Sequence, residues 1–124
     1  MTSLARIAGT AGTATTPDWF TLAPVEAMRK LLKKTGWSVD SVDLFEINEA
    51  LSVVPMAAIQ ELGLGAERVN VEGGAVALGH PIGASGARIL VTLLYAMADQ
   101  GARRGVAAIC LGGGEALAMT VERT

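Results

Sequence analysis

The chain has 124 residues and a mass of 12.7 kDa, the size of one ordinary domain. Apolar residues make up 51% of it and charged residues 18%, so it can bury a sizeable core and is not a disordered linker. Ten basic residues against twelve acidic ones give a net charge of −2, which provides no strongly basic surface, so we expect neither nucleic acid nor a membrane as a partner.

The first half of the chain predicts two strands and two helices in alternation. Residues 4–16 favour a strand that ends before a proline. Apolar residues then recur at helical spacing over residues 21–34, and Gly36 is a natural helix end. Residues 42–47 form a short apolar run typical of a buried strand, and residues 51–62 predict a second helix.

The second half continues this alternation and closes with two adjacent strands. Residues 68–71 predict a strand, which leads into a glycine-rich run over residues 72–80. The strongest helical pattern covers residues 83–97, and residues 106–111 and 116–121 predict a hairpin of strands around three glycines. The order β-α-β-α-β-α-β-β predicts an α/β fold: a five-stranded mixed sheet with helices on both faces.

The single cysteine and the single histidine restrict the chemistry of any site. With one cysteine, Cys110, an internal disulfide framework is excluded, and with one histidine, His80, most histidine-based metal sites are excluded, so we expect no metal. Residues 1–6 lack the apolar core of a secretory signal, and no apolar run approaches the roughly 20 residues of a membrane helix. We therefore expect a reducing, cytoplasmic environment.

Three chemically capable side chains fall where predicted strands end and loops begin. Asn48 follows the second predicted strand, His80 precedes the third helix, and Cys110 ends the strand before the three glycines. Ligands of open α/β sheets bind beyond the carboxyl ends of the strands, so these side chains are candidates for one shared pocket. The nearby carboxylates Glu46 and Glu49 are interpreted as structural or solvated rather than as a catalytic pair.

Each candidate also has a purely structural interpretation. Taken alone, a cysteine at the end of an apolar strand such as Cys110 is more often a small core residue, although the glycines at 112–114 would let a substrate approach the main chain closely. His80, held by Pro81 among glycines, can serve as a structural hydrogen-bonding group. Asn48 alone is typical of a helix cap.

Three sequence motifs, taken together, resemble the C-terminal signatures of thiolases. They are Asn-Glu-Ala at 48–50, the long glycine-rich motif at 73–88 that contains Gly-His-Pro-Ile-Gly-Ala-Ser-Gly, and Cys-Leu-Gly-Gly-Gly at 110–114. The resemblance extends over nearly the whole chain, so residues 1–124 are interpreted as a thiolase C-terminal domain, the C-terminal half of an acyl-CoA acyltransferase.

The resemblance implies Claisen chemistry, in which two acyl-CoA molecules condense to a 3-oxoacyl-CoA plus CoA, or the reverse thiolysis. Coenzyme A thioesters are then the substrates and no prosthetic group is expected. Cys110 matches the family's acid/base cysteine, and His80 matches the histidine that activates a nucleophilic cysteine and donates an N–H to one oxyanion hole. Asn48 matches the residue that holds a water in that hole, and the Gly112 N–H matches a donor of a second hole.

The same resemblance assigns Leu51, Pro81 and Gly113 to substrate binding. Leu51 stands where the family usually has phenylalanine, which removes an aromatic wall near the acyl or pantetheine tunnel. Glu72 stands where asparagine or histidine is frequent.

The family's nucleophilic cysteine lies in an N-terminal half that this sequence does not contain. We therefore expect the isolated chain to be inactive as a thiolase and to need an N-terminal half as its partner, within an oligomer. The partner is expected on an apolar patch of the helix at 83–97, beyond the face that meets its own sheet. Residues proposed for this patch are Ile82, Ala87, Leu90 and Leu94.

Three alternatives stay open at this stage. The chain is suited to be a non-catalytic scaffold or regulatory partner of a thiolase, although a scaffold needs none of the three polar side chains. A ketoacyl synthase is disfavoured, because those enzymes typically have histidine or asparagine where Cys110 stands. The chain can also be a piece of one longer polypeptide.

Overall fold

The structure is a computed structural model that describes residues 3–124; residues 1 and 2 of the predicted N-terminal segment lie outside it. Four strands form one mixed sheet in the order β1-β4-β3-β2. Strands β2 and β3 run parallel, whereas β4 is antiparallel to both of its neighbours. The strands are β1 (Ala5–Ala14), β2 (Leu44–Ile47), β3 (Arg104–Leu111) and β4 (Glu115–Arg123).

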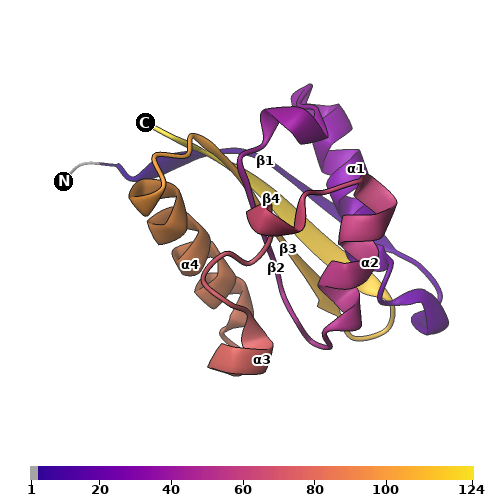
Figure 1. Cartoon of the computed structure of the whole chain (residues 1–124). Coiled ribbons are helices and arrows are strands. Elements are labelled where there is room, and N and C mark those ends of the chain that lie inside the picture. The colour runs from indigo at the N-terminus through magenta and orange to yellow at the C-terminus, as the bar shows by residue number, and fades with distance from the viewer. Residues whose placement is uncertain (1–2) are drawn as a thin grey trace.

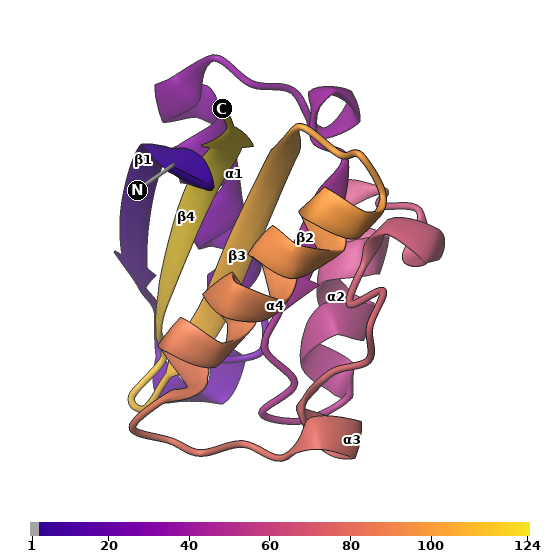
Figure 2. The ribbon, with the colours of Figure 1, turned by 90° about the vertical axis from the view of Figure 1, so that its left-hand side faces the viewer.

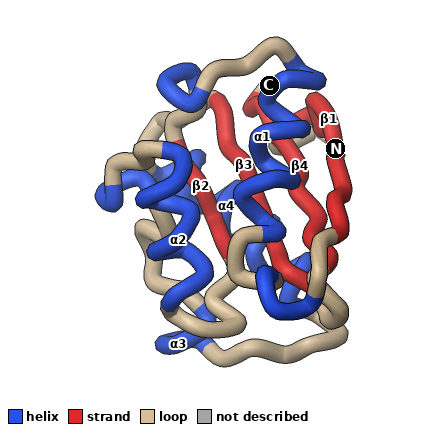
Figure 3. The backbone as a smooth tube through the Cα atoms, turned by 90° about the vertical axis from the view of Figure 1, so that its right-hand side faces the viewer, coloured by secondary structure: helices blue, strands red, loops and turns tan. Residues whose placement is uncertain are grey.

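Helices cover both faces of this sheet, so the molecule has three layers (Figure 1). Helices α1 (Ala23–Thr35) and α2 (Val53–Leu62) lie together on one face (Figure 3). Helix α4 (Ser85–Asp99) lies on the other face, and a single turn, α3 (Ala75–Leu78), precedes it. Short 3-10 turns at Pro17–Trp19, Val39–Ser41 and Ala66–Arg68 fill the connections.

The predicted helices are confirmed, and glycine ends two of them as expected. Gly36 and Gly63 both have the left-handed conformation, with φ of 71° and 64°, at the C-termini of α1 and α2. Glycine adopts this conformation without steric cost, and it lets the chain turn back at the end of a helix.

The sheet separates two apolar cores, and alternation along β3 assigns its side chains to them. Val106, Ala108 and Cys110 point toward α1 and α2, where they pack with Phe45 and Met28. On the other face Ala107 packs with residues of α4 that include Leu93 and Met97. Helix α4 lies so close that a Cβ at Gly105 would be 2.6 Å from Sδ of Met97.

The predicted five-stranded sheet is wrong: the sheet has four strands, because the segment at residues 68–71 does not form one. That segment makes one isolated parallel bridge, Phe45 to Val69, and then leaves the sheet at Asn70, which has a φ of 49°. The side chain of Asn70 replaces the missing strand: its Oδ1 accepts from the Ile47 N–H at 2.7 Å, and its Nδ2 donates to the Ile47 carbonyl at 2.9 Å. The amide side chain of Asn70 thus provides hydrogen-bond partners for the backbone at the edge of β2. The backbone after Asn70 can therefore turn toward the glycine-rich run.

Helix α4 covers only half of its face of the sheet. Figure 2 shows it crossing β3 and β2 while β4 and β1 stay open beside it. The side chains left there include Leu117 and Ile7, which are 52% and 61% exposed.

The start of β1 and the end of β4 lie together at one end of the sheet, where Ala5 is opposite Arg123 (Figure 1). The turn from β3 to β4 and the short helix α3 lie at the opposite end (Figure 2). That opposite end is where the chemically capable side chains gather.

Candidate functional site

A cavity of about 510 Å³ opens at the carboxyl end of β3, and it brings together most of the candidate residues. His80, Cys110, Gly112 and Gly113 all line it, as the placement of their loops predicts. The remaining wall is mainly apolar and consists of Pro17, Phe20, Ala50, Ile82, Ile109, Leu111 and Gly114.

Cys110 is both a core residue and a lining residue of this cavity. It belongs to β3 and is 8% exposed, and its neighbours in the core lie under α1 and α2. Desolvation by burial raises the pKa of the Cys110 thiol. At neutral pH the group is therefore a protonated thiol, which is suited to give up a proton more than to act as a standing thiolate nucleophile.

The turn that follows Cys110 requires glycine. Gly113 and Gly114 have φ values of 84° and 90°, a conformation that other residues rarely adopt. A Cβ at Gly114 would lie 2.4 Å from the carbonyl oxygen of Thr15, and the Thr15 N–H donates to the Gly114 carbonyl at 2.9 Å. The loop after β1 thus clamps the turn and fixes the main chain at the mouth of the cavity.

His80 lies in the loop between α3 and α4, and both of its ring nitrogens have partners. Its Nε2 is 3.4 Å from Nδ2 of Asn48, and its Nδ1 is 2.5 Å from Oγ of Ser85. Ser85 is the first residue of α4 and is fully buried. The imidazole is thus held at both ring nitrogens at the edge of the cavity.

Asn48 lies directly after β2 and is fully buried. Its backbone N–H donates to the Ala108 carbonyl at 2.9 Å, which continues the pairing of β2 with β3. The N-cap position of α2 is Ser52, so the interpretation of Asn48 as a helix cap is wrong. Its side chain is directed to His80 and to Arg88 instead.

A buried ion pair lies behind these residues. Arg88 of α4 donates from Nη1 to Oε1 of Glu46 at 3.0 Å, and the Glu46 residue is 1% exposed. Desolvation raises the pKa of Glu46 to about 7, although the hydrogen bond from Arg88 acts in the opposite direction. The neighbouring Glu49 has a different position: its Oε2 accepts from the Val76 N–H at 3.0 Å, in the first turn of α3.

Two of the predicted substrate-binding residues do not line the cavity. Leu51 is 55% exposed and precedes α2, and Pro81 acts through its carbonyl, which accepts from the N–H and the hydroxyl of Ser85. Gly113 does line the cavity, as predicted.

Sequence reasoning assigned no role at the site to three residues that support it: Ser85, Arg88 and Glu46, which it interpreted only as structural or solvated. A signal was present for each of them. A charged residue inside an otherwise apolar strand needs a buried partner, which marks Glu46. Ser85 and Arg88 are three residues apart at the start of the strongest helix, a spacing that places both on one side of it.

Other kinds of site find no support in the part of the chain that the structure describes. Residues 3–124 contain no group of three or more His, Cys, Asp or Glu side chains placed to hold a metal ion. None of the helices described is both long enough and apolar enough to span a membrane.

Comparison with known proteins agrees with the motifs at the cavity. Residues 1–123 match the family model described as "Thiolase, C-terminal domain", so the chain belongs to this family. Among curated relatives, the cytosolic acetyl-CoA acetyltransferase of Mus musculus is 52% identical over 120 residues, 97% of this chain. The acetyl-CoA acetyltransferase of Chromobacterium violaceum is also 52% identical over 120 residues.

Solved structures give the same result for the fold. The acetyl-CoA acetyltransferase of Bacillus anthracis has a TM-score of 0.97 and 42% identity, and it is matched over 100% of this chain. Human mitochondrial 3-ketoacyl-CoA thiolase in complex with CoA has a TM-score of 0.95 and 39% identity over 99% of this chain.

The chain corresponds to less than a third of these proteins. It spans 30% of the mouse relative, 31% of the one from C. violaceum and 32% of the Bacillus anthracis chain. The remaining two thirds have no counterpart in this sequence.

Proposed function

We propose that residues 1–124 are the C-terminal domain of a thiolase, which supplies Cys110, His80, Asn48 and the Gly112 N–H to a site that an N-terminal half completes. Coenzyme A thioesters are the substrates, and the reaction joins two acyl groups as a 3-oxoacyl-CoA or cleaves that product. The observation that carries this proposal is the convergence of His80, Cys110 and the glycine turn on one cavity, with Asn48 against the imidazole.

The protonated state of Cys110 fits the proton transfer that thiolysis needs. A nucleophilic cysteine of the N-terminal half attacks C3 of the 3-oxoacyl-CoA, and the bond between C2 and C3 breaks. The released carbanion equivalent takes the proton of the Cys110 thiol and leaves as an acyl-CoA. The acyl-enzyme then passes its acyl group to CoA, whose thiol proton restores Cys110. In the condensation direction the same proton moves from the second acyl-CoA to Cys110.

His80 and the main-chain N–H groups serve the charges that develop during these steps. An imidazole nitrogen with a free lone pair takes the proton of the nucleophilic cysteine, and afterwards its N–H stabilises an oxyanion. Asn48 positions a water in the same oxyanion hole, and the Gly112 N–H serves the second hole. Gly113, Leu51 and Pro81 belong to the substrate-binding region in this proposal, Gly113 as a lining residue and the others from outside the cavity.

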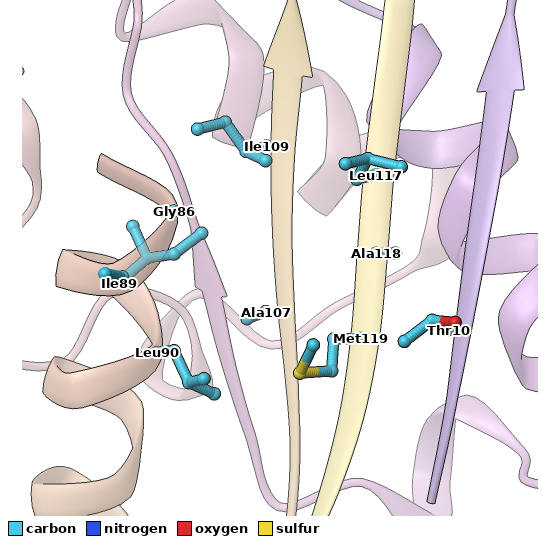
Figure 4. Close-up of a pocket in the computed structure, with 10 residues that line it drawn as sticks. Thr10, Gly86, Ile89, Leu90, Ala107, Ile109, Leu117, Ala118 and Met119 are labelled. Atoms are coloured by element: carbon cyan, nitrogen blue, oxygen red, sulfur yellow. The ribbon is translucent and has the colours of Figure 1, made fainter. Parts of the chain in front are cut away.

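The half-covered face of the sheet is the proposed contact with the N-terminal half. An apolar cavity of about 330 Å³ lies where α4 leaves β3 and β4 open, and Ala87 and Leu90 line it with Leu117 and Met119 (Figure 4). Of the residues predicted for this patch, Leu94 is half-buried in the core under α4, and Ile82 is 87% exposed but borders the catalytic cavity. An apolar face of this kind favours a protein partner.

The setting in the cell is part of the same proposal. The cytosolic mouse relative supports a cytoplasmic location, while human 3-ketoacyl-CoA thiolase is mitochondrial. Acyl-CoA substrates would place the protein in lipid metabolism, and we propose that the assembled enzyme is an oligomer.

The test is reconstitution with a separate N-terminal half. The chain is mixed with the N-terminal two thirds of the Bacillus anthracis enzyme, and thiolysis of acetoacetyl-CoA is followed together with complex formation by size-exclusion chromatography. We expect no turnover by the chain alone and turnover by the complex. Turnover by the pure chain, or a stable complex without activity, would contradict the proposal.

A second variant separates an enzyme from a non-catalytic scaffold. Cys110→Ala should assemble normally and reduce turnover about 10²- to 10⁴-fold, the usual contribution of a general acid or base. Asp40→Asn, a change on a surface turn far from the cavity, is the matched control and should keep full activity. If Cys110→Ala kept full activity, the scaffold interpretation would stand.

A further inference from the structure

A continuous chain of polar side chains connects the buried ion pair to the imidazole at the cavity. Glu46, Asn48 and Ser85 are at most 1% exposed, although each carries polar atoms that burial would otherwise penalise. Arg88 lies among them with a side chain that is 18% exposed. The roles proposed above do not account for Glu46, Ser85 or Arg88.

Arg88 fixes the direction of the hydrogen bonds among these side chains, because a guanidinium group can only donate. Its Nη1 donates to Oε1 of Glu46 at 3.0 Å, and its Nη2 faces Oδ1 of Asn48 at 3.5 Å. The second contact is long, but a full positive charge at that distance still holds the negative end of the amide dipole toward it. The amide nitrogen of Asn48 is consequently on the side away from Arg88.

The amide nitrogen then determines the state of one ring nitrogen of His80. Nδ2 of Asn48 carries only hydrogens and lies 3.4 Å from Nε2 of the imidazole. A contact between two donors would be repulsive, so Nε2 has to be the acceptor and carries no proton.

The other ring nitrogen is compatible with the same tautomer. Oγ of Ser85 lies 3.0 Å from the Pro81 carbonyl and 2.5 Å from Nδ1 of His80. With the ring proton on Nδ1, this nitrogen donates to Oγ of Ser85, and the hydroxyl hydrogen is directed to the Pro81 carbonyl. The two ends of the ring thus give a single consistent assignment.

We propose that Arg88, acting through Asn48, and Ser85 are positioning residues that hold the neutral imidazole of His80 as its Nδ1–H tautomer, with the lone pair on Nε2. A histidine side chain free in water prefers the opposite tautomer, with the proton on Nε2. The fold therefore reverses the ordinary preference with an arginine that does not line the cavity.

The consequence for catalysis rests on the proposed function, whereas the tautomer itself does not. An unprotonated Nε2 is ready to take a proton without first exchanging its own with water. If the tautomer were reversed, the ring would present an N–H where a base is required.

Nitrogen-15 NMR of the 124-residue chain tests the proposal directly, because His80 is the only histidine and gives the only imidazole signals. The spectrum is recorded at a pH high enough for the ring to be neutral. We expect the Nδ1–H form to dominate in the wild type. Dominance of the Nε2–H form would overturn the proposal before any variant is made.

Variants then test each side of the ring. Ser85→Ala removes the acceptor at Nδ1, and Arg88→Met combined with Glu46→Gln removes the cation without leaving a buried carboxylate unpaired. Each should change the tautomer ratio at least about tenfold, or about 1.4 kcal/mol, toward Nε2–H. Ser85→Thr keeps the hydroxyl and should restore the wild-type ratio.

Asn48→Asp gives a positive test of the same logic. It presents an acceptor to Nε2 and should favour Nε2–H in a protein of nearly unchanged shape.

The matched control is Arg104→Met, which removes another arginine paired with a carboxylate, 3.3 Å from Glu122 at the other end of the sheet. It should leave the tautomer unchanged, and the backbone amide spectrum verifies that every variant is folded. If the variants at 85 and 88 keep the wild-type tautomer while folded, the proposal is wrong.

The two proposals fail separately. Finding the Nδ1–H tautomer in a protein that never gains activity with an N-terminal half would refute the proposed function alone. Full activity in the complex together with an Nε2–H ground state would refute the positioning role alone.

Discussion

Replacing Glu46 by glutamine removes a buried carboxyl group while preserving the size of the side chain, and it should change how the stability of the fold depends on pH. Desolvation raises the pKa of Glu46 to about 7, against an ordinary value of 4.5. The folded chain therefore binds this proton more tightly than the unfolded chain does. The stability supplied by the proton is fully present below pH 4.5 and is lost as the pH rises through 7.

The size of the effect follows from the distance between the two pKa values. At about 1.4 kcal/mol for each pH unit, the difference between 4.5 and about 7 corresponds to about 3 kcal/mol. Most of that loss falls between pH 5 and pH 8. The loss reflects the ionisation of one buried acid.

Urea unfolding of the wild type and of Glu46→Gln from pH 5 to pH 8 measures this difference. The wild type should lose about 2–3 kcal/mol more than the variant over that range, which moves the urea midpoint by about 1–2 M. Parallel stability curves, or a wild type that gains stability with pH, would refute the reasoning.

Glu122 provides a control, because its pKa is shifted in the opposite direction from that of Glu46. Arg6, with Arg104 and Arg103, holds the pKa of this carboxyl below its usual range. Its contribution to stability is therefore present above the ordinary pKa of the unfolded chain and is lost as the pH falls through the lowered value. Glu122→Gln should flatten the acid side of the stability curve and leave the slope between pH 6 and pH 8 intact.

Three further outcomes follow from packing and burial. Gly105→Ala should lower the free energy of unfolding by about 1–3 kcal/mol, because its Cβ would lie 2.6 Å from Sδ of Met97. The control Gly83→Ala, with no atom within 4 Å of the new Cβ, should change it by less than about 0.5 kcal/mol. Equal effects of the two variants in thermal unfolding would contradict the close packing of α4. Asn70→Ala should lower the free energy of unfolding, measured in urea, by about 2–3 kcal/mol, because the N–H and carbonyl of Ile47 lose their hydrogen-bond partners. A change below about 0.5 kcal/mol would show that water replaces the side-chain amide. Iodoacetamide should alkylate Cys110 at pH 8 at least about ten times more slowly in the folded chain than in the chain unfolded by urea, because burial raises the pKa of the thiol. Equal alkylation rates would contradict the burial of this thiol.

The spacing of apolar residues was sufficient to predict the long helices and strands, because each of them buries one continuous apolar face. The pattern at residues 83–97 predicts α4, and the run at 106–111 predicts β3, within two residues at each end. The segment at 68–71 has the same local appearance as a strand. What removes it from the sheet is the side chain of Asn70, and no local pattern indicates that an amide will take the place of a backbone.

The residues of the candidate site also fall into a group that the sequence predicts and a group that it does not. Residues at the ends of strands and in glycine loops were predictable, because the carboxyl ends of parallel strands meet at one edge of a sheet. The residues behind them depend on contacts between distant segments: Arg88 reaches Glu46 across 42 positions of the sequence. Such pairings are decided by how α4 crosses β2, which the sequence pattern of neither element specifies.

The pairing of the first strand with the last one has a consequence for the synthesis of this protein. Ala5 lies opposite Arg123, and β4 sits inside the sheet between β1 and β3. The ribosome therefore releases β1 long before β4, the strand that it pairs with in the described sheet.

Up to residue 114, a nascent chain contains β2 and β3 but lacks the strand that joins them to β1. Contacts across such a separation close slowly, and unpaired strand edges are prone to aggregate while they wait. Residues 115–123, which form β4, thus provide the closing step in the assembly of this sheet.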